Sequence, residues 1–391
     1  MEAFMNIKNK VKIIFKENIE KTLIKVKRKL ETNKFKDIRR KKIYGKINLS
    51  DEQKKQIDEL FIVNYGEKIP YTWHKHYTAF TGNFDPQYFL ELLYIPEFEH
   101  FMNHNKEYIK AFSDKNVLPF FAKAVDVKMP KAYISATSGI YHDDNLTELP
   151  FSEVISKVSN IGEAFIKPTV DTSSGKGCSL VCFLNGIDII TGRTVAEIIK
   201  LMGKDFVLQE RVICHESIRK VYPDSVNTFR IITYRWQDGY YHMPIIMRIG
   251  QGGNYLDNAH AGGMFIAIDD DGTVHKTAFT EFKQEYIKHP DTGLVFEGYR
   301  IDLLPKVIEA TKKMCNTISQ VGCINWDFTI DAAGEPVLIE ANMNGGSIWL
   351  VEMAHGCGGF GEKTPEVLKW LKKMKKVGIT EYDKYQYGNN I

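Results

Sequence analysis

The chain has 391 residues, of which 43% are hydrophobic and 26% are charged, so it can bury a large core over two or three packed lobes. No apolar run reaches the roughly 18 residues that a membrane-spanning helix needs, and no signal peptide is visible. Six cysteines are scattered without zinc-type pairing, so we expect a reduced, cytoplasmic protein; they are Cys178, Cys182, Cys214, Cys315, Cys323 and Cys357.

The net charge of +3 is unevenly distributed, which excludes a uniformly basic nucleic-acid-binding protein. Residues 1–46 contain 16 Lys and Arg against 5 Asp and Glu, a net charge of +11, so the other 345 residues carry −8. Two interpretations of this basic arm remain open. It forms a helix on an anionic membrane surface at the inner face of the membrane, or a helix that packs on the body or a partner. Its apolar residues recur at helical spacing, at Ile7, Val11, Ile14, Ile19, Leu23, Val26 and Leu30.

The segment 47–113 is rich in aromatic residues and predicts a helical N-terminal region, with helices at about 51–64 and 86–112. His74 and His76 are interpreted as ordinary histidines, because no third metal ligand lies near them in the sequence. From residue 114 onwards short strands alternate with helices, which indicates an α/β body. We expect strands at 131–135, 164–168, 178–184, 206–213, 228–236, 240–249 and 264–268, and helices at 148–160, 194–202 and about 302–320.

The segment 169–177 lies between two predicted strands and is rich in Thr, Ser and Gly. Small residues let backbone N–H groups approach an anion closely, and Lys176 adds charge, so this loop can close over a triphosphate. Lys167, on the preceding strand, would direct a cation at the same phosphates. The segment is not a Walker A sequence. A flexible hairpin loop is the alternative interpretation.

The predicted strand 206–213 ends in residues that can offer backbone donors and acceptors to an adenine edge, namely Gln209, Glu210 and Val212. His215 or Glu216, just beyond, could reach a ribose. An amphipathic strand end without a ligand is the alternative.

Arg230 and Arg248 alternate with apolar neighbours, so at least one should project onto a polar face of a sheet. Guanidinium groups suit carboxylate or phosphate recognition, and a surface ion pair is the alternative. The small-residue segment Asn258–Gly263 predicts a turn that can approach a substrate.

The stretch 326–342 predicts a hairpin of two strands around Asp331–Gly334. Period-two alternation puts Glu340 and Asn342 on one face of the second strand, and separates Asp327 from its apolar neighbours on the first. Oxygen ligands without His or Cys suit Mg²⁺ held against phosphates better than zinc.

In this order, the elements resemble the ATP-grasp superfamily. Trp73-His74, Thr81–Pro86, Asp114–Asn116 and Pro223–Arg230 extend the match and resemble its sugar-transfer-associated family over about residues 50–372. The resemblance implies an α+β ATP-grasp fold, in which two α+β subdomains hold ATP between them, with a helical N-terminal region. The expected parts are a basic amphipathic arm (1–46), the helical region (47–113), the N-terminal ATP-grasp subdomains (114–215), the C-terminal subdomain (216–372) and a tail (373–391).

The resemblance also implies a role for each site residue. Lys115 and Lys167 would bind the α- and β-phosphates, and Arg230 and Arg248 would face the transferred γ-phosphoryl group or a substrate carboxylate. Gln209, Glu210 and Val212 would hold the adenine, and Asp327, Glu340 and Asn342 would ligate Mg²⁺. The backbone of the phosphate loop would cover the β- and γ-phosphates, at Ser173, Ser174, Gly175, Lys176 and Gly177.

The resulting hypothesis is an ATP- and Mg²⁺-dependent carboxylate–amine ligase acting through an acyl phosphate. Its substrates would be a small-molecule or glycan carboxylate and an amine, as in attaching an amino acid to a bacterial cell-surface polysaccharide or its sugar precursor. Two alternatives stay open: a kinase of a sugar or glycan hydroxyl, and a nucleotide-binding adaptor for membrane glycosyltransferases. The substrates and the oligomeric state do not follow from the sequence.

Overall fold

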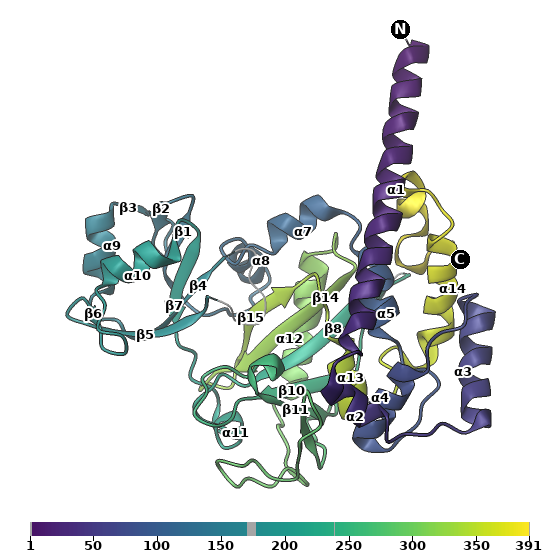
Figure 1. Ribbon diagram of the computed structural model, residues 1–391. Helices are drawn as coiled ribbons and strands as arrows, with labels where there is room; N and C mark the ends of the chain where they lie inside the picture. The colour runs from purple at the N-terminus through teal and green to yellow at the C-terminus, as the bar shows by residue number, and fades with distance from the viewer. Residues whose placement is uncertain (1, 170–176, 238, 391) are drawn as a thin grey trace.

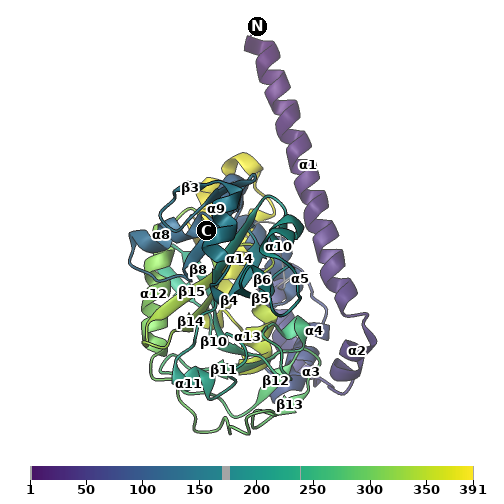
Figure 2. The ribbon, with the colours of Figure 1, turned by 90° about the vertical axis from the view of Figure 1, so that its left-hand side faces the viewer.

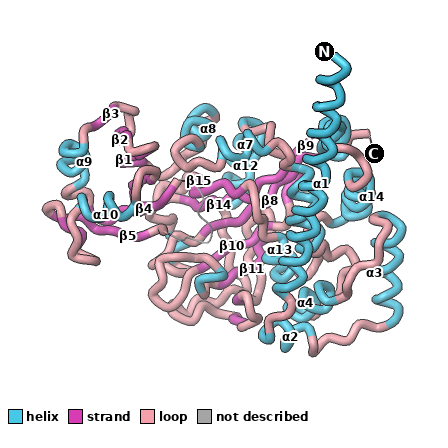
Figure 3. The backbone as a smooth tube through the Cα atoms, turned by 45° about the horizontal axis from the view of Figure 1, so that its top comes forward, coloured by secondary structure: helices cyan, strands magenta, loops and turns pink. Residues whose placement is uncertain are grey.

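The computed structural model describes residues 2–169, 177–237 and 239–390, with side chains from Val11 onwards. Two β-sheets lie beside each other, and a helical region packs on the side of the larger sheet that faces away from the smaller one (Figure 1; Figure 3). All pairings between the named strands are antiparallel. The α/β body expected from the alternation of elements is therefore wrong, and the α+β class is confirmed.

The smaller sheet has the strand order β3-β2-β1-β7-β4-β5-β6. Buried residues alternate along its strands, as in β4, where Ala164 and Ile166 face the core under two helices. Asn185 and Gly186 both have positive φ angles (51° and 78°), as the predicted turn between β5 and β6 requires. The elements are β1 (Ala132–Thr137), β2 (Ile140–His142), β3 (Glu148–Leu149), α9 (Phe151–Val158), β4 (Gly162–Pro168), β5 (Ser179–Leu184), β6 (Ile187–Asp188), α10 (Val195–Met202) and β7 (Phe206–Glu210).

The larger sheet has the order β13-β12-β11-β10-β8-β14-β15, and β9 pairs with β8 outside this path. The single strand expected at 240–249 is split, because Pro244 has no N–H group to continue the ladder. The elements are α11 (Glu216–Arg219), β8 (Thr228–Trp236), β9 (Gly239–His242), β10 (Ile245–Ile249), β11 (Met264–Ile268), β12 (Ala278–Thr280), β13 (Glu285–Tyr286), α12 (Leu304–Thr317), β14 (Cys323–Ile330) and β15 (Pro336–Asn342).

The predicted hairpin 326–342 is present as β14 and β15, with one irregularity. Asp327 pairs with Glu340, but Phe328 pairs with Leu338, so Ile339 is an extra residue that forms a β-bulge. The bulge places the Asp327 and Glu340 backbones directly opposite each other.

The helical N-terminal region buries a dense aromatic cluster against β8 and the C-terminal helices. The phenyl ring of Phe98 lies edge-on to those of Phe360 and Tyr234, at centroid distances of 4.6 and 6.1 Å. His74 and His76 are buried in this cluster. The helix expected at 86–112 is broken into short pieces, and a π-helical turn (η1) contains Pro96. The region comprises α1 (Glu2–Lys34), α2 (Ile38–Tyr44), α3 (Asp51–Asn64), α4 (Thr72–Thr81), α5 (Glu91–Leu93), η1 (Tyr94–Phe98), α6 (Glu99–Met102), α7 (Lys106–Phe112) and α8 (Leu118–Ala124).

The C-terminal segment packs into the same cluster. Tyr382, Tyr385 and Tyr387 are each at most 9% exposed, and Trp370 donates a hydrogen bond to the backbone of Tyr385. Residues 373–391 are thus attached to the body over their described length. The long helix α1 runs along one side of the molecule, and its N-terminal end projects beyond the body (Figure 2). The last elements are α13 (Ile348–His355), η3 (Gly361–Lys363), α14 (Thr364–Met374) and η4 (Ile379–Gly388).

Candidate active site between the two sheets

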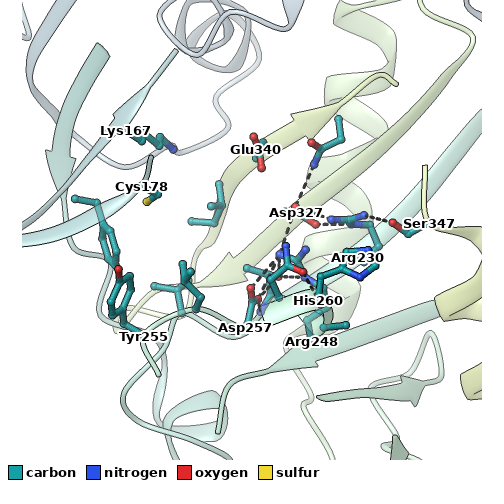
Figure 4. A pocket seen from close by; sticks show the side chains of 18 of the residues that line it. Lys167, Cys178, Arg230, Arg248, Tyr255, Asp257, His260, Asp327, Glu340 and Ser347 are labelled. Carbon is teal, nitrogen blue, oxygen red and sulfur yellow. Dashed lines mark hydrogen bonds and ion pairs between the residues drawn. The ribbon is translucent and has the colours of Figure 1, made fainter. Parts of the chain in front are cut away.

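A cavity of about 270 Å³ opens between the two sheets (Figure 4). The strands of the smaller sheet and residues that adjoin them contribute Phe165, Lys167, Cys178, Gln209, Glu210 and Val212. The larger sheet contributes Thr228, Arg230, Arg248, Asp327, Ile339, Glu340 and Asn342, and loops add Lys115, Asp257–His260 and Ser347 among others. The structure therefore brings together most of the site residues that the sequence predicted, although they are spread along the chain from Lys115 to Asn342.

An alternating network of two arginines and two aspartates forms the floor of the cavity. The Nε and Nη2 atoms of Arg230 donate to the two carboxylate oxygens of Asp327, at 2.6 and 3.0 Å. Nη2 of Arg248 lies 3.4 Å from Oδ2 of Asp327 and 3.1 Å from Oδ1 of Asp257. Asp327 is only 1% exposed. The bidentate contact fixes the plane of Arg230, so its guanidinium is pre-oriented at the cavity.

The two aspartates of the network have opposite pKa shifts. Burial by itself raises the pKa of Asp327, but the charges of Arg230 and Arg248 outweigh burial and lower the pKa below its ordinary value. For Asp257 burial prevails over the attraction of Arg248, and its pKa is raised. The direct contacts account for the difference, because Asp327 accepts two hydrogen bonds from Arg230 and also faces Arg248, whereas Asp257 contacts Arg248.

Asp327, Glu340 and Asn342 fit a hard divalent cation. All three side chains offer oxygen atoms, all three line the same cavity, and the β-bulge sets Asp327 opposite Glu340. The amide nitrogen of Asn342 donates to Oδ2 of Asp327 at 3.2 Å, so in this orientation the amide oxygen points away from Asp327, and a half-turn of the amide group would direct it at a cation shared with Asp327. Both Asp327 oxygens already accept hydrogen bonds from Arg230, but a carboxylate has further lone pairs for a metal.

Two lysines approach Glu340 from the other side. Nζ of Lys115 lies 3.2 Å from Oε1 of Glu340. Lys167 on β4 faces Glu340 across the cavity (Figure 4), and burial lowers its pKa although the charge of Glu340 opposes this. The backbone N–H of Lys115 donates to the carbonyl of Thr169, which holds the two lysine-bearing segments together.

Most of the predicted phosphate loop lies outside the described residues. Ser173, Ser174, Gly175 and Lys176 fall outside the described residues. Gly177, at the end of the loop, has a φ of 76°, and a Cβ atom there would lie 3.0 Å from the ring of Pro168. Glycine therefore lets the two ends of the loop approach closely.

The residues predicted to contact the adenine and the ribose do not all lie at the cavity. Gln209, Glu210 and Val212 line the cavity, and the Glu210 side chain accepts a hydrogen bond from the backbone of Lys131 at 2.9 Å. His215 does not line it. Its backbone donates to the carbonyl of Ile330, and its ring caps the short helix α11, because the chain turns away after β7.

Sequence reasoning missed several residues of the site. Asp257 completes the arginine network, and Ser347 accepts a hydrogen bond from Arg230 at 3.2 Å. The buried carboxylate of Glu99, in the helical region, accepts from the backbone N–H groups of Gly345 and Gly346 at 2.6 and 2.7 Å. These contacts hold the loop after β15 against the cavity. In the sequence, the only indication of this contact was the Gly345-Gly346 pair, close to Glu340 and Asn342, because Glu99 lies in a distant part of the chain.

A family model described as sugar-transfer-associated ATP-grasp matches residues 95–366. No curated protein sequence matches the chain significantly. Similar solved structures include D-alanine–D-alanine ligase from Bacillus anthracis, 13% identical, with a TM-score of 0.38 over 68% of this chain and 69% of that one.

Another is L-amino acid ligase from Bacillus licheniformis, also 13% identical, with a TM-score of 0.38 over 67% of this chain and 49% of that one. An ADP complex of N5-carboxyaminoimidazole ribonucleotide synthetase is 14% identical, with a TM-score of 0.35 over 60% of this chain and 45% of that one. The chain thus spans about half the length of these last two proteins.

Proposed function

The chain belongs to the sugar-transfer-associated ATP-grasp family and has the ATP-grasp fold that its motif order predicted, and on this premise we propose that it is an ATP- and Mg²⁺-dependent carboxylate–amine ligase. The observation that carries the proposal is the cavity itself. Four cationic side chains, of Lys115, Lys167, Arg230 and Arg248, surround the oxygen ligands on the hairpin. This combination suits a polyphosphate held with a divalent cation.

The proposed reaction has two steps, and both balance without a covalent enzyme intermediate. A substrate carboxylate oxygen attacks the γ-phosphorus of ATP, the bond from that phosphorus to the β–γ bridging oxygen breaks, and ADP leaves with the electron pair. The amine nitrogen then attacks the carbon of the acyl phosphate, the carbon–oxygen bond breaks, inorganic phosphate leaves, and the amine releases a proton to solvent. Such chemistry depends on positioning and on charge neutralisation.

Each residue of the cavity has a role in that scheme. Lys115 and Lys167 would neutralise nucleotide phosphates, and the edge formed by Gln209, Glu210 and Val212 would hold the adenine. Arg230, fixed by Asp327, and Arg248, fixed by Asp257, would bind the incoming carboxylate or the transferred phosphoryl group. When held by Glu340, Asp327 and Asn342, Mg²⁺ would supply positive charge against the phosphates.

We further propose that the acceptor is a sugar or glycan of the bacterial cell surface, and that the other substrate is an amino acid or related amine. The description of the family supports a sugar-linked substrate.

Hydroxylamine trapping tests the reaction type. The purified chain is incubated with ATP, Mg²⁺, hydroxylamine and a panel of uronic acids and amino acids, and hydroxamate and ADP are measured. We expect both products to appear together with at least one carboxylate. Phosphorylated sugar without hydroxamate would favour a kinase instead. ATP binding by calorimetry without ADP release from any acceptor would favour a nucleotide-binding adaptor.

A further inference from the structure

The helix α1 has two faces of opposite character. Toward the body it turns polar residues, which make specific contacts. Arg28 lies 2.7 Å from the buried carboxylate of Glu97, and Glu20 accepts hydrogen bonds from the side chains of His100 and Tyr382, both at 2.7 Å. The partly or fully buried residues of this face are Ile13, Glu17, Glu20, Ile24, Lys27, Arg28 and Glu31. They recur at spacings of three and four, so they form one side of the helix.

The opposite face of α1 is apolar and exposed. Its exposed fractions are Val11 60%, Ile14 57%, Phe15 66%, Ile19 44%, Leu23 51%, Val26 50% and Leu30 57%. From Val11 to Leu30 this stripe extends for about 30 Å along the helix. Single exposed apolar residues are ordinary on a protein surface, whereas a contiguous stripe marks an interaction site. Figure 2 shows α1 at the edge of the molecule, with its outer side clear of the body.

The charges of α1 are divided in the same way. Glu17, Glu20 and Glu31, the acidic residues among its described side chains, all belong to the body face. Exposed lysines border the apolar stripe, at Lys12, Lys16, Lys21, Lys25 and Lys29. The outer side of the helix is therefore mainly apolar in the middle, with exposed Asn18 and Thr22 among the apolar side chains, and positive at its edges, while its negative charges are turned inward.

We propose that the outer face of α1 binds an anionic lipid membrane, with the helix lying in the plane of the interface. Both terms of interfacial binding are present: apolar side chains that can enter the acyl boundary, and basic side chains that reach lipid phosphates. A second copy of the chain is a poorer occupant, because joining two such faces brings like charges together at both edges. No helix among the described residues is long and apolar enough to cross a membrane.

The two interpretations of the basic arm then apply to different faces of α1. The helix does pack on the body, through a mainly charged side from which Ile24 also packs against the aromatic cluster. The apolar side remains available for the membrane. The inference does not depend on the proposed ligase activity, since no residue of the stripe belongs to the cavity between the sheets.

Vesicle flotation with the full chain tests the proposal. The probes are vesicles of phosphatidylcholine alone and of equal parts phosphatidylcholine and phosphatidylglycerol. We expect the chain to float with the mixed vesicles, and to do so at least about tenfold more weakly after Phe15→Ser, Leu23→Ser and Leu30→Ser are combined. The matched control combines Ile189→Ser, Ile190→Ser and Leu201→Ser, which remove apolar residues of similar exposure (55–67%) from the smaller sheet's lobe. The control should bind like the wild type.

A charge-reversal variant keeps the test decisive. Lys12→Glu, Lys16→Glu and Lys25→Glu should abolish binding to the mixed vesicles, whereas the exposed lysines Lys200, Lys312 and Lys313, changed likewise, should not. Thermal unfolding checks that each variant is folded. Absence of wild-type binding to the mixed vesicles would overturn the proposal, as would equal binding by the Ser variant and its control. Self-association that the Ser variant abolishes, without vesicle binding, would assign the face to a second copy instead.

Discussion

Replacing Asp327 with Asn should have a different effect from replacing Glu340 with Gln, although both belong to the same candidate metal site. Asp327 is 1% exposed and receives two hydrogen bonds from Arg230, with Arg248 close by. The Asp327→Asn substitution would leave two buried guanidinium groups facing a neutral amide. The Glu340 side chain is 32% exposed, lies at the edge of the cavity and pairs with Lys115. The Glu340→Gln substitution would leave its neighbours partly solvated.

The expected magnitudes follow from this difference in burial. Removing one partner from a buried ion pair costs about 3–5 kcal/mol of unfolding free energy. A domain has only about 5–15 kcal/mol in total, so Asp327→Asn should be markedly less stable. Exposed ion pairs contribute about 1 kcal/mol or less, and the pair of Lys115 and Glu340, with side chains 13% and 32% exposed, should lie closer to that value than the fully buried pair of Asp327 does. Glu340→Gln should therefore unfold nearly like the wild type, while losing the charge that a cation needs.

Urea titration followed by tryptophan fluorescence measures the unfolding free energy. Calorimetry of ATP binding with and without Mg²⁺ measures how far ATP binding depends on the cation. We expect Glu340→Gln to retain stability but to lose the Mg²⁺ dependence of ATP binding, and Asp327→Asn to lose both. Glu335→Gln is the matched control, because Glu335 lies in the same hairpin, is exposed and pairs with surface Lys306. Equal unfolding free energies for the Asp327 and Glu340 variants would refute the buried-pair argument. Wild-type Mg²⁺ dependence in Glu340→Gln would refute the metal assignment.

Three further predictions concern the same region. Because the folded state lowers the pKa of Asp327, the ionised carboxylate stabilises the fold at any pH above its unfolded-state pKa of about 3.9, and this contribution is lost as the pH falls toward the folded-state pKa. The difference in unfolding free energy between the wild type and Asp327→Asn, measured by urea titration, should therefore close in acid. Lys167→Ala should weaken ATP binding about tenfold or more by calorimetry, whereas Lys157→Ala on α9 should leave it unchanged. Glu99→Gln removes a charged acceptor from the N–H groups of Gly345 and Gly346, and should lower the unfolding free energy by about 1–3 kcal/mol in urea titration.

Local patterns predicted the elements that carry the site, because those patterns depend on near neighbours in the chain. The hairpin of β14 and β15 follows from period-two alternation around a turn. The order of motifs then implied that Lys115, Lys167 and the hairpin share one cavity, and they do.

Long-range contacts could not be predicted in this way. Asp257 reaches Arg248 from the residue just before the predicted turn Asn258–Gly263, whose pattern gave no indication of this ion pair, and Glu99 reaches Gly345 across 246 positions. In α1 the periodicity identified two faces but gave no indication of which one packs on the body. The hydrophobic pattern alone would favour the apolar face. The partners that reverse this choice, Glu97 and His100, lie in another part of the chain.

The motif in the hairpin presented Asp327, Glu340 and Asn342 as equivalent ligands, and the structure makes them unequal. The charge of Asp327 is already balanced by Arg230 and Arg248, and Asn342 donates to Asp327. Glu340 faces lysines that are themselves candidates for phosphate binding. A nucleotide that engages Lys115 and Lys167 would thus release Glu340 for a cation. We therefore expect the charge of Glu340 to link nucleotide binding to cation binding, whereas the contacts of Asp327 also hold the two arginines in place.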